Sequence, residues 1–209
     1  MNKIKKERKP YGHKLPYWVA DFLNNYDEIK KERQTFLKNN PNYIKPIDEI
    51  SEEQKELNED KKWKALFIYG YGYYNDKIKA DFPLITQLIE KNRKAISLVM
   101  FSTMESGKEI PPHTGNNFGV LRIQIGIDIH NPDLCGLKVE DKVFQIKEGE
   151  IMVFDDTFTH SAWNNGETNR TVLIIDFLKP LRFPYSMFNK MHLKSIQNSP
   201  YIRNVLNKL

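Results

Sequence analysis

The sequence predicts a mainly β protein, an antiparallel sandwich or jelly roll with helical segments before and after it. Beyond Lys94 the chain becomes a series of short runs rich in β-branched and aromatic residues, separated by Gly, Pro, Asn and Asp. One of these runs alternates strictly between apolar and polar residues, which is the period of a strand. Helical periodicity is confined to the flanking segments. The β-rich runs are 95–104, 120–129, 137–140, 142–147, 150–156 and 170–178.

The residues before the β-rich part favour an arm followed by a helix. Residues 1–16 contain Pro10 and Pro16 and show no periodicity, so we expect an extended arm. From Trp18 to Leu37 apolar residues recur at helical spacing, which predicts one amphipathic helix. Residues 38–62 are polar and acidic and are expected to form a surface loop with room for a short helix.

Two further helices and one more strand are expected. Residues 63–70 (WKALFIYG) have strand composition. Pro83 suits the first turn of a helix, and the tail from Tyr185 returns to helical composition. We therefore expect a single domain over residues 1–209, which consists of a basic arm (1–16), a helical and mixed part (17–94), a β core (95–180) and a helical tail (181–209).

The bulk composition is that of an ordinary globular protein. The chain has 209 residues, of which 40% are hydrophobic and 28% charged. No apolar run approaches the roughly 18–20 residues that cross a bilayer, and no apolar stretch follows the basic N-terminus as in a secretory signal. The lone cysteine, Cys135, cannot form an intrachain disulfide. We therefore expect a cytoplasmic protein with no membrane segment.

The net charge of +5 comes from the two ends of the chain. Residues 1–14 hold six basic residues and one acidic residue, and six more basic residues follow Phe177 with no acidic residue among them. The part between these ends is net acidic. A nucleic-acid binder usually carries a basic face across its fold, so this distribution favours solvated termini over a nucleic-acid partner, with an anionic partner as the alternative.

Two of the five histidines have the context of a metal site. His113 lies in the turn PPHTGNN between two expected strands, and His160 follows a strand in VFDDTFTHSAW. Imidazoles carried by neighbouring strands can converge on one ion, and imidazole suits iron, zinc, copper and nickel alike. Mononuclear iron oxygenases combine two histidines with one carboxylate. Gly115, two residues after the first histidine, offers no ligand atom.

Three polar residues of the β core are candidates for binding an anion. In 120–129, Arg122 and Gln124 share the polar face, which either meets solvent or lines a cavity between the sheets. Arg170 begins a strand, and a buried arginine needs an anion. Its guanidinium would bind a dicarboxylate or pair with a neighbour such as Asp176 or Glu167.

The segments HTGNNFGVLRIQIGIDIHNPDLCGLKV and EGEIMVFDDTFTHSAWNNGETNRTVLIIDFLKP resemble the aspartyl/asparaginyl β-hydroxylase family of iron(II)/2-oxoglutarate oxygenases. The resemblance is strong over residues 102–180 and looser over 63–88. The combination of H-T-G, L-R, F-D-D-x-F-x-H and a downstream N-R is specific, whereas no single motif would be. It implies a double-stranded β-helix, the cupin-like form of the jelly roll.

The resemblance also implies which residues bind the metal. His113 and His160 fall on the two iron-binding histidines of the family and would be both the metal ligands and the catalytic residues. Gly115 matches the branch of the family that has glycine in place of the carboxylate, with water completing the coordination sphere. Asp155 and Asp156 would either orient His160 or close the turn before it.

A second set of residues would bind 2-oxoglutarate. Arg170 falls on the arginine that holds the distal carboxylate, and Ser102 on a serine that assists it. Arg122 falls on an arginine near the chelating end. Gln124 occupies a position where the family usually has histidine; an amide can donate to a carboxylate but carries no positive charge.

The expected function is that of an iron(II)- and 2-oxoglutarate-dependent dioxygenase that hydroxylates an amino acid, a peptide or a small metabolite at an unactivated carbon. The alternatives are a halogenase, because Gly115 leaves room for chloride, a non-catalytic metal- or ligand-binding jelly roll, and a binder of nucleic acid or of an anionic surface through the basic ends. The tyrosines of residues 69–74 would either form the floor of a substrate pocket or pack around a glycine turn. Substrate and oligomeric state are left open by the sequence.

Overall fold

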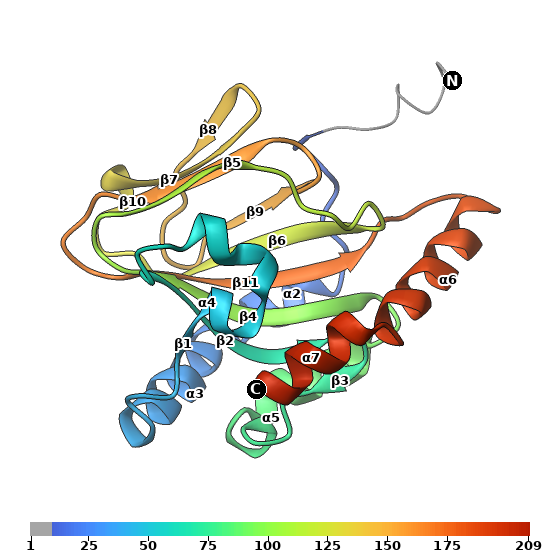
Figure 1. Cartoon of the computed structure of the whole chain (residues 1–209), viewed down its shortest axis with the longest axis horizontal. Helices are drawn as coiled ribbons and strands as arrows, with labels where there is room; N and C mark the ends of the chain where they lie inside the picture. The colour runs from blue at the N-terminus through green and yellow to red at the C-terminus, as the bar shows by residue number, and fades with distance from the viewer. Residues whose placement is uncertain (1–9) are drawn as a thin grey trace.

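The computed structural model of the protein describes residues 10–209. Eight strands form two facing sheets, and the chain crosses between the sheets at every step except from β7 to β8, which are neighbours in the same sheet (Figure 1). The major sheet has the core order β4-β11-β6-β9 and the minor sheet the order β5-β10-β7-β8. This alternation defines a double-stranded β-helix and confirms the expected fold class. The strands are β4 (Ile96–Met104), β5 (Lys108–His113), β6 (Val120–Asp128), β7 (Cys135–Val139), β8 (Lys142–Phe144), β9 (Ile151–Phe154), β10 (His160–Asn164) and β11 (Arg170–Leu178).

The N-terminal part extends the major sheet and covers its outer face. β2 pairs with β4, and β1 and β3 both pair with β2. Apolar side chains of α2, α3 and α5 pack on the outer face of the sheet in one core cluster. The elements are α2 (Val19–Asn24), α3 (Tyr26–Asn39), β1 (Lys45–Pro46), α4 (Ile47–Ile50), η1 (Glu52–Leu57), β2 (Trp63–Gly70), β3 (Tyr73–Tyr74), η2 (Lys79–Asp81) and α5 (Pro83–Asn92).

The inner face of the major sheet meets the minor sheet and the C-terminal helices. A short helix η3 (Pro132–Leu134) precedes β7, and the chain ends in α6 (Tyr185–Gln197) and α7 (Pro200–Lys208). Side chains of α4 and α7 share a second core cluster with inner-face residues of both sheets. Figure 1 shows α4 and α7 in front of β2 and β4, on the side opposite α2.

The alternation predicted for 120–129 is borne out. Leu121, Ile123, Ile125 and Ile127 belong to the outer cluster under the helices, so the residues between them point to the inner face. Residues paired in register lie on the same face of a sheet, so Asp176, paired with Arg122, and Ile174, paired with Gln124, also point to the inner face. The inner face thus receives the polar residues that the sequence singles out.

The segment from Trp18 to Leu37 is two helices rather than the single helix predicted. Asn25 separates α2 from α3 with φ of −110° and ψ of 22°, and its side-chain amide donates to the Asp21 carbonyl. An asparagine that hydrogen-bonds to local backbone in this way competes with the helical ladder, and the pattern of apolar residues continues across the break because both helices pack on the same face.

Residues 38–62 are less superficial than predicted. Ile47 and Ile50 of α4 are buried, and Asp48 is a buried carboxylate that pairs with Asn58 and Lys61. The segment is held in place because Ile47 and Ile50 pack into the inner core cluster with α7. The segment therefore combines an exposed polar side with a buried side that contains both isoleucines and the paired polar residues Asp48 and Asn58.

Residues 1–9 of the expected arm lie outside the described residues. From Pro10 onward the arm is tied to the core, because Tyr11 forms a β-bridge with Phe154 and the Asp155 amide donates to the Pro10 carbonyl at 2.9 Å. Among residues 10–209 the structure contains no helix long and apolar enough to cross a membrane.

Candidate metal centre

Two histidines from neighbouring strands of the minor sheet face each other. His113 ends β5 and His160 begins β10, and the antiparallel register pairs them directly. Their ring centroids are 4.2 Å apart, with the rings inclined by 52°. The structure therefore brings together the two residues that the sequence selected as metal ligands.

Both rings are oriented in the same way by their own backbone. Nδ1–H of His113 donates to the Pro111 carbonyl at 2.8 Å, and Nδ1–H of His160 donates to the Phe158 carbonyl at 2.9 Å. Burial, together with the neighbouring His113, lowers the pKa of His160 to about 3, and burial also lowers the pKa of His113. Both rings are thus neutral at pH 7 and keep Nε2 as a lone-pair donor, the form that binds metals.

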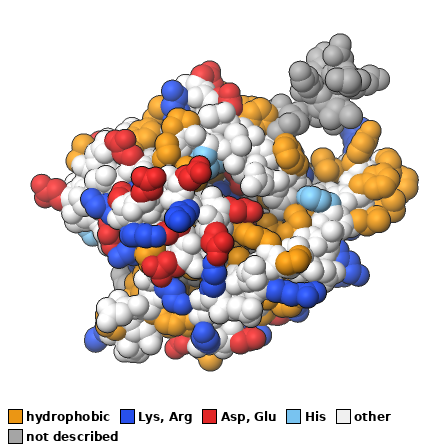
Figure 2. Space-filling model, viewed as in Figure 1, with side chains coloured by type: hydrophobic (Ala, Val, Ile, Leu, Met, Phe, Trp, Pro, Cys, Tyr) orange, Lys and Arg blue, Asp and Glu red, His pale blue; other side chains and the backbone are white. Residues whose placement is uncertain are grey.

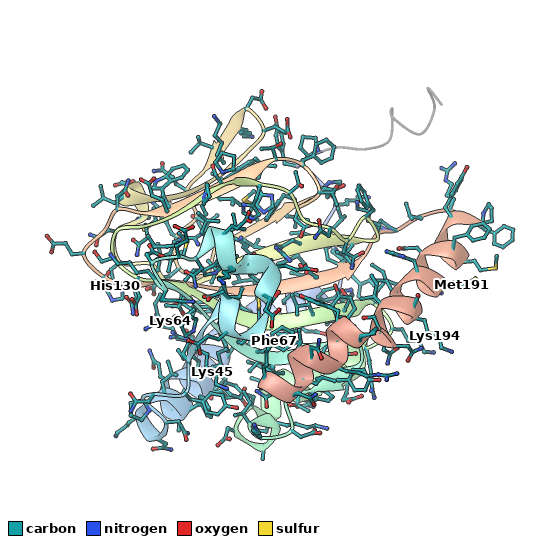
Figure 3. All side chains as sticks on the ribbon, in the orientation of Figure 1. Lys45, Lys64, Phe67, His130, Met191 and Lys194 are labelled. Atoms are coloured by element: carbon teal, nitrogen blue, oxygen red, sulfur yellow. The ribbon has the colours of Figure 1, made fainter. Side chains whose placement is uncertain are left out.

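The histidine pair lines a cavity of about 540 Å³. Polar residues of segment 113–117, β6, β10 and β11 form one part of its wall. The other part is apolar and comes from α4, β2, β4 and α7, while α6 contributes its second half. Phe67, labelled in Figure 3, belongs to this apolar part, and the polar residues Ser51, Glu53 and Gln54 line the cavity next to α4. The apolar residues are Ile47, Ile50, Trp63, Ala65, Phe67, Leu98, Met100, Ile202, Val205 and Leu206.

The structure divides the tyrosines of residues 69–74 between the two alternatives. Tyr69 and Tyr74 pack in the outer core, whereas Tyr71 lines the cavity. Tyr71 has φ of +49°, in the left-handed region that side chains seldom adopt, and its hydroxyl accepts a hydrogen bond from Asn117. Burial raises the pKa of Tyr71 to about 12, so the cavity wall holds a neutral phenol there.

Arg122 joins two carboxylates at the cavity wall. Its Nε and Nη2 donate to Asp176 at 2.8 Å each, and Nη2 lies 3.2 Å from an Asp156 oxygen. Burial opposes the charge, but Asp176 and Asp156 together raise the pKa of Arg122. The sequence offers Asp176 as an alternative ion-pair partner of Arg170, but the structure pairs it with Arg122. A role of Arg122 toward a co-substrate stays a prediction.

Asp156 lies beside Gly115, the residue two positions after His113 that has no side chain. A Cβ added to Gly115 would lie 2.5 Å from Oδ2 of Asp156, and the Gly115 amide donates to the Asp156 carbonyl at 2.7 Å. Oδ1 of Asp156 is buried without a hydrogen-bond partner in the described part of the chain. Burial raises the pKa of this carboxyl to about 6. Asp156 lines the same cavity as the two histidines, and one of its carboxylate oxygens has no hydrogen-bond partner among the described residues.

Arg170 is buried in the interior, and no carboxylate of residues 10–209 pairs with it. It is 4% exposed, its Nη2 donates to the Gln124 side-chain oxygen at 3.3 Å, and Nη1 lies 3.8 Å from the Met104 sulfur. No acidic group of residues 10–209 forms an ion pair with it, and burial lowers its pKa to about 10. A buried cation in such surroundings favours an incoming anion.

Ser102 and Gln124 lie on the same inner face as Arg170. The Ser102 hydroxyl accepts a hydrogen bond from the Trp63 indole at 2.9 Å, which leaves its own O–H to donate. Ser102 pairs with Val172 and Gln124 with Ile174, so both flank the strand that begins with Arg170. These three residues project into the interior without lining the described cavity, whereas Arg122 and the histidines line it.

Sequence reasoning missed the helical wall of the cavity. Ile47 and Ile50 of α4 share the inner core cluster with Val205 of α7 and with Leu209, which follows α7. The helical spacing of Ile202, Val205 and Leu209 marks an apolar stripe on the tail, but no sequence pattern indicates which surface it covers.

Neighbouring aspartates are expected to respond in opposite ways to substitution. Asp156→Asn should lower iron(II) affinity about ten- to a hundredfold, and the metal-free protein should be as stable or more stable because a buried charge is removed. Asp155 instead accepts from the Thr157 amide and hydroxyl and pairs with Lys179. Asp155→Asn should therefore lower the unfolding temperature and leave iron affinity unchanged. Calorimetry of metal binding and of unfolding measures both; equal iron affinity of Asp156→Asn and wild type would contradict the assignment.

Comparison of the sequence with known proteins identifies its family. The sequence profile described as aspartyl/asparaginyl beta-hydroxylase matches residues 23–180. An ornithine lipid ester-linked acyl 2-hydroxylase from Rhizobium tropici is 30% identical over 190 residues, covering 90% of this chain and 67% of that protein. The aspartyl/asparaginyl beta-hydroxylase of Mus musculus is 26% identical over 132 residues, covering 61% of this chain and 18% of that protein.

Among solved structures, the Cupin_2 domain of an XRE family transcriptional regulator from Enterobacter cloacae has a TM-score of 0.40 at 9% identity. The match covers 57% of this chain and 99% of that domain.

Proposed function

The chain belongs to the aspartyl/asparaginyl β-hydroxylase family, and on that premise we propose that it is an iron(II)- and 2-oxoglutarate-dependent hydroxylase. The observation that carries the proposal is the histidine pair. Two neutral imidazoles meet in register, and each is fixed through Nδ1 so that Nε2 is left for a metal. Imidazole alone does not choose among iron, zinc, copper and nickel; the family premise favours iron.

The residues around the pair fit a divalent cation. His113 and His160 would supply two ligands, and the Asp156 oxygen that has no hydrogen-bond partner among the described residues would accept a hydrogen bond from a metal-bound water. Arg122 and Asp176 would hold that carboxylate in place. No group of three or more His, Cys, Asp and Glu within residues 10–209 is arranged to hold a metal, so water and co-substrate would complete the coordination.

The interior fits a dicarboxylate. Arg170 would receive the distal carboxylate, because its charge has no acidic partner of its own among the described residues. Ser102 would donate its free O–H to the same group, and the Gln124 amide would donate from the other side. Gln124 already bonds to Arg170, so the amide that replaces the family's usual histidine would orient the guanidinium.

The chemistry is shared between the bound groups and the protein. When bound, iron(II) and 2-oxoglutarate use oxygen to place a hydroxyl on the substrate carbon, with succinate and carbon dioxide released. The protein orients both ligands through the histidines and Arg170, and it excludes water from the buried wall around them. Hydroxylation is favoured over halogenation, because the negative Asp156 beside Gly115 would repel a chloride ion.

The cavity favours a substrate with an apolar part. Its polar wall at the histidines passes into an apolar wall formed by α4 and α7, which would suit an acyl chain or an apolar side chain. The Rhizobium relative, by its name, acts on the ester-linked acyl group of a lipid. We propose an acylated molecule as the first class to examine, beside the amino acids, peptides and small metabolites expected from the sequence.

Product analysis tests the proposed function. The purified protein with iron(II), 2-oxoglutarate and oxygen should form succinate, and the rate should rise with a substrate of the right class. A panel of acyl amides, peptides and free amino acids, assayed with and without chloride, separates hydroxylation from chlorination by product mass. A folded, iron-loaded protein that forms no succinate with any member would favour the non-catalytic alternative.

A further inference from the structure

The solvent-facing side of α6 and of the turn before it is apolar. Phe183 is 79% exposed, Phe188 57% and Met191 61%, and Leu181, Tyr185 and Met187 are also exposed. Phe188 and Met191 lie on one side of the helix, three residues apart. We call this set of six residues the α6 face. Figure 2 shows hydrophobic side chains gathered at the right edge of the molecule, where Figure 1 places the start of α6.

The helix is held to the protein by the side away from Phe188 and Met191. Asn189 and Leu193 are buried, and the Asn189 amide donates to the Gly119 carbonyl at 2.8 Å. An ordinary surface helix turns its apolar side to the core and its polar side to water. In α6 a polar side chain anchors the first half while the aromatic and methionine side chains face solvent. Exposed apolar patches of this kind mark interaction surfaces.

The charged residues of α6 and of the turn before it are all positive. Arg182, Lys190 and Lys194 are exposed beside it, and residues 178–209 contain no acidic residue. Figure 3 shows Met191 and Lys194 both projecting outward from α6. Apolar side chains flanked by lysine and arginine, with no acidic residues, match the boundary of an anionic bilayer, where the apolar groups enter the acyl region and the cations meet phosphate.

We infer that the α6 face docks the protein on the surface of an anionic lipid bilayer. The second half of the same helix lines the cavity through His192, Ser195 and Ile196. Docking would thus bring the cavity wall close to the bilayer, where acylated molecules reside. The purpose of the docking, delivery of an acylated substrate, rests on the proposed function, whereas the docking itself does not.

Vesicle sedimentation with the full chain tests the inference. We expect binding to vesicles of phosphatidylcholine and phosphatidylglycerol in a 3:1 ratio, weakened by salt, and binding at least about tenfold weaker to phosphatidylcholine alone. Phe188→Gln/Met191→Gln should weaken binding to the anionic vesicles about tenfold or more, and so should Lys190→Gln/Lys194→Gln.

Matched controls separate this surface from nonspecific binding through exposed apolar or charged side chains elsewhere. Leu134→Gln/Val143→Gln removes two exposed apolar side chains elsewhere, and Lys77→Gln/Lys138→Gln removes two exposed charges elsewhere. Both controls should bind as wild type does. Equal losses in the control and α6 variants would overturn the inference, as would wild type that stays in the supernatant at low salt.

A protein partner is the other outcome to be recognised. If light scattering shows a stable dimer that Phe188→Gln/Met191→Gln dissociates, the α6 face is an interface between copies and the inference is wrong. Vesicle binding requires neither metal nor 2-oxoglutarate, so its failure leaves the proposed hydroxylase standing. Loss of succinate formation would in turn leave vesicle binding intact.

Discussion

His113→Ala and His160→Ala should each abolish iron(II) binding at micromolar metal while the fold is retained. The two rings would be the only protein side chains that ligate the ion directly, so removing either one leaves a single imidazole, which does not hold a divalent cation at that concentration. The fold should survive because both side chains line a cavity wall rather than fill a core cluster. Metal titration by calorimetry, with circular dichroism of each variant, measures both effects.

Two other histidines supply the control. His192 of α6 lines the same cavity outside the pair, and His130, labelled in Figure 3, is exposed beyond β6. His192→Ala and His130→Ala should bind iron(II) as wild type does. Full iron affinity in either His113→Ala or His160→Ala would show that the metal centre is assigned to the wrong residues.

Arg170→Met should weaken 2-oxoglutarate binding and at the same time stabilise the ligand-free protein. Loss of a hydrogen-bonding charged group costs about 1.5–3 kcal/mol of binding free energy, or roughly ten- to a hundredfold in affinity. Removal of a buried cation that has no acidic partner in the described chain should raise the unfolding temperature. Iron(II) affinity in the absence of co-substrate should be unchanged.

Arg122→Met is the matched comparison, because Arg122 has the partners that Arg170 lacks. Its removal leaves the carboxylates of Asp176 and Asp156 buried without their cation, which should destabilise the fold by about 3–5 kcal/mol. Denaturant unfolding of the two arginine variants should therefore give shifts of opposite sign. A destabilised Arg170→Met with unchanged 2-oxoglutarate affinity would mean that Arg170 serves the fold alone.

The β core could be predicted from the sequence because its signals are local. Alternation in 120–129 separates the residues of the two faces of β6, and Ile123, Ile125 and Ile127 do pack together beneath the helices. The break between α2 and α3 at Asn25 could not be predicted from the sequence, because the apolar pattern continues through it. The burial of α4 was missed for the opposite reason, since its contacts come from α7, more than 150 residues further along the chain.

The site was only partly predictable. The separation of 47 residues between the histidines permits many arrangements, and the register of β5 with β10 selects one. Asp156 was considered only as a residue that orients His160 or closes a turn; its position against Gly115 depends on a contact between two loops. The pairing of Asp176 with Arg122 rather than Arg170 follows from the register of β6 with β11, which spacing along the chain does not contain.

An anaerobic titration tests the central claim most directly. Iron(II) and 2-oxoglutarate are added to the protein without oxygen, and the visible spectrum is followed for the weak charge-transfer band of the iron–2-oxoglutarate chelate. We expect the band only when both are present, saturating near one equivalent of each, absent in His113→Ala and His160→Ala, and shifted to higher 2-oxoglutarate concentration in Arg170→Met. A folded wild-type protein that develops no band, or a band that persists without His113 and His160, would contradict the proposed metal centre.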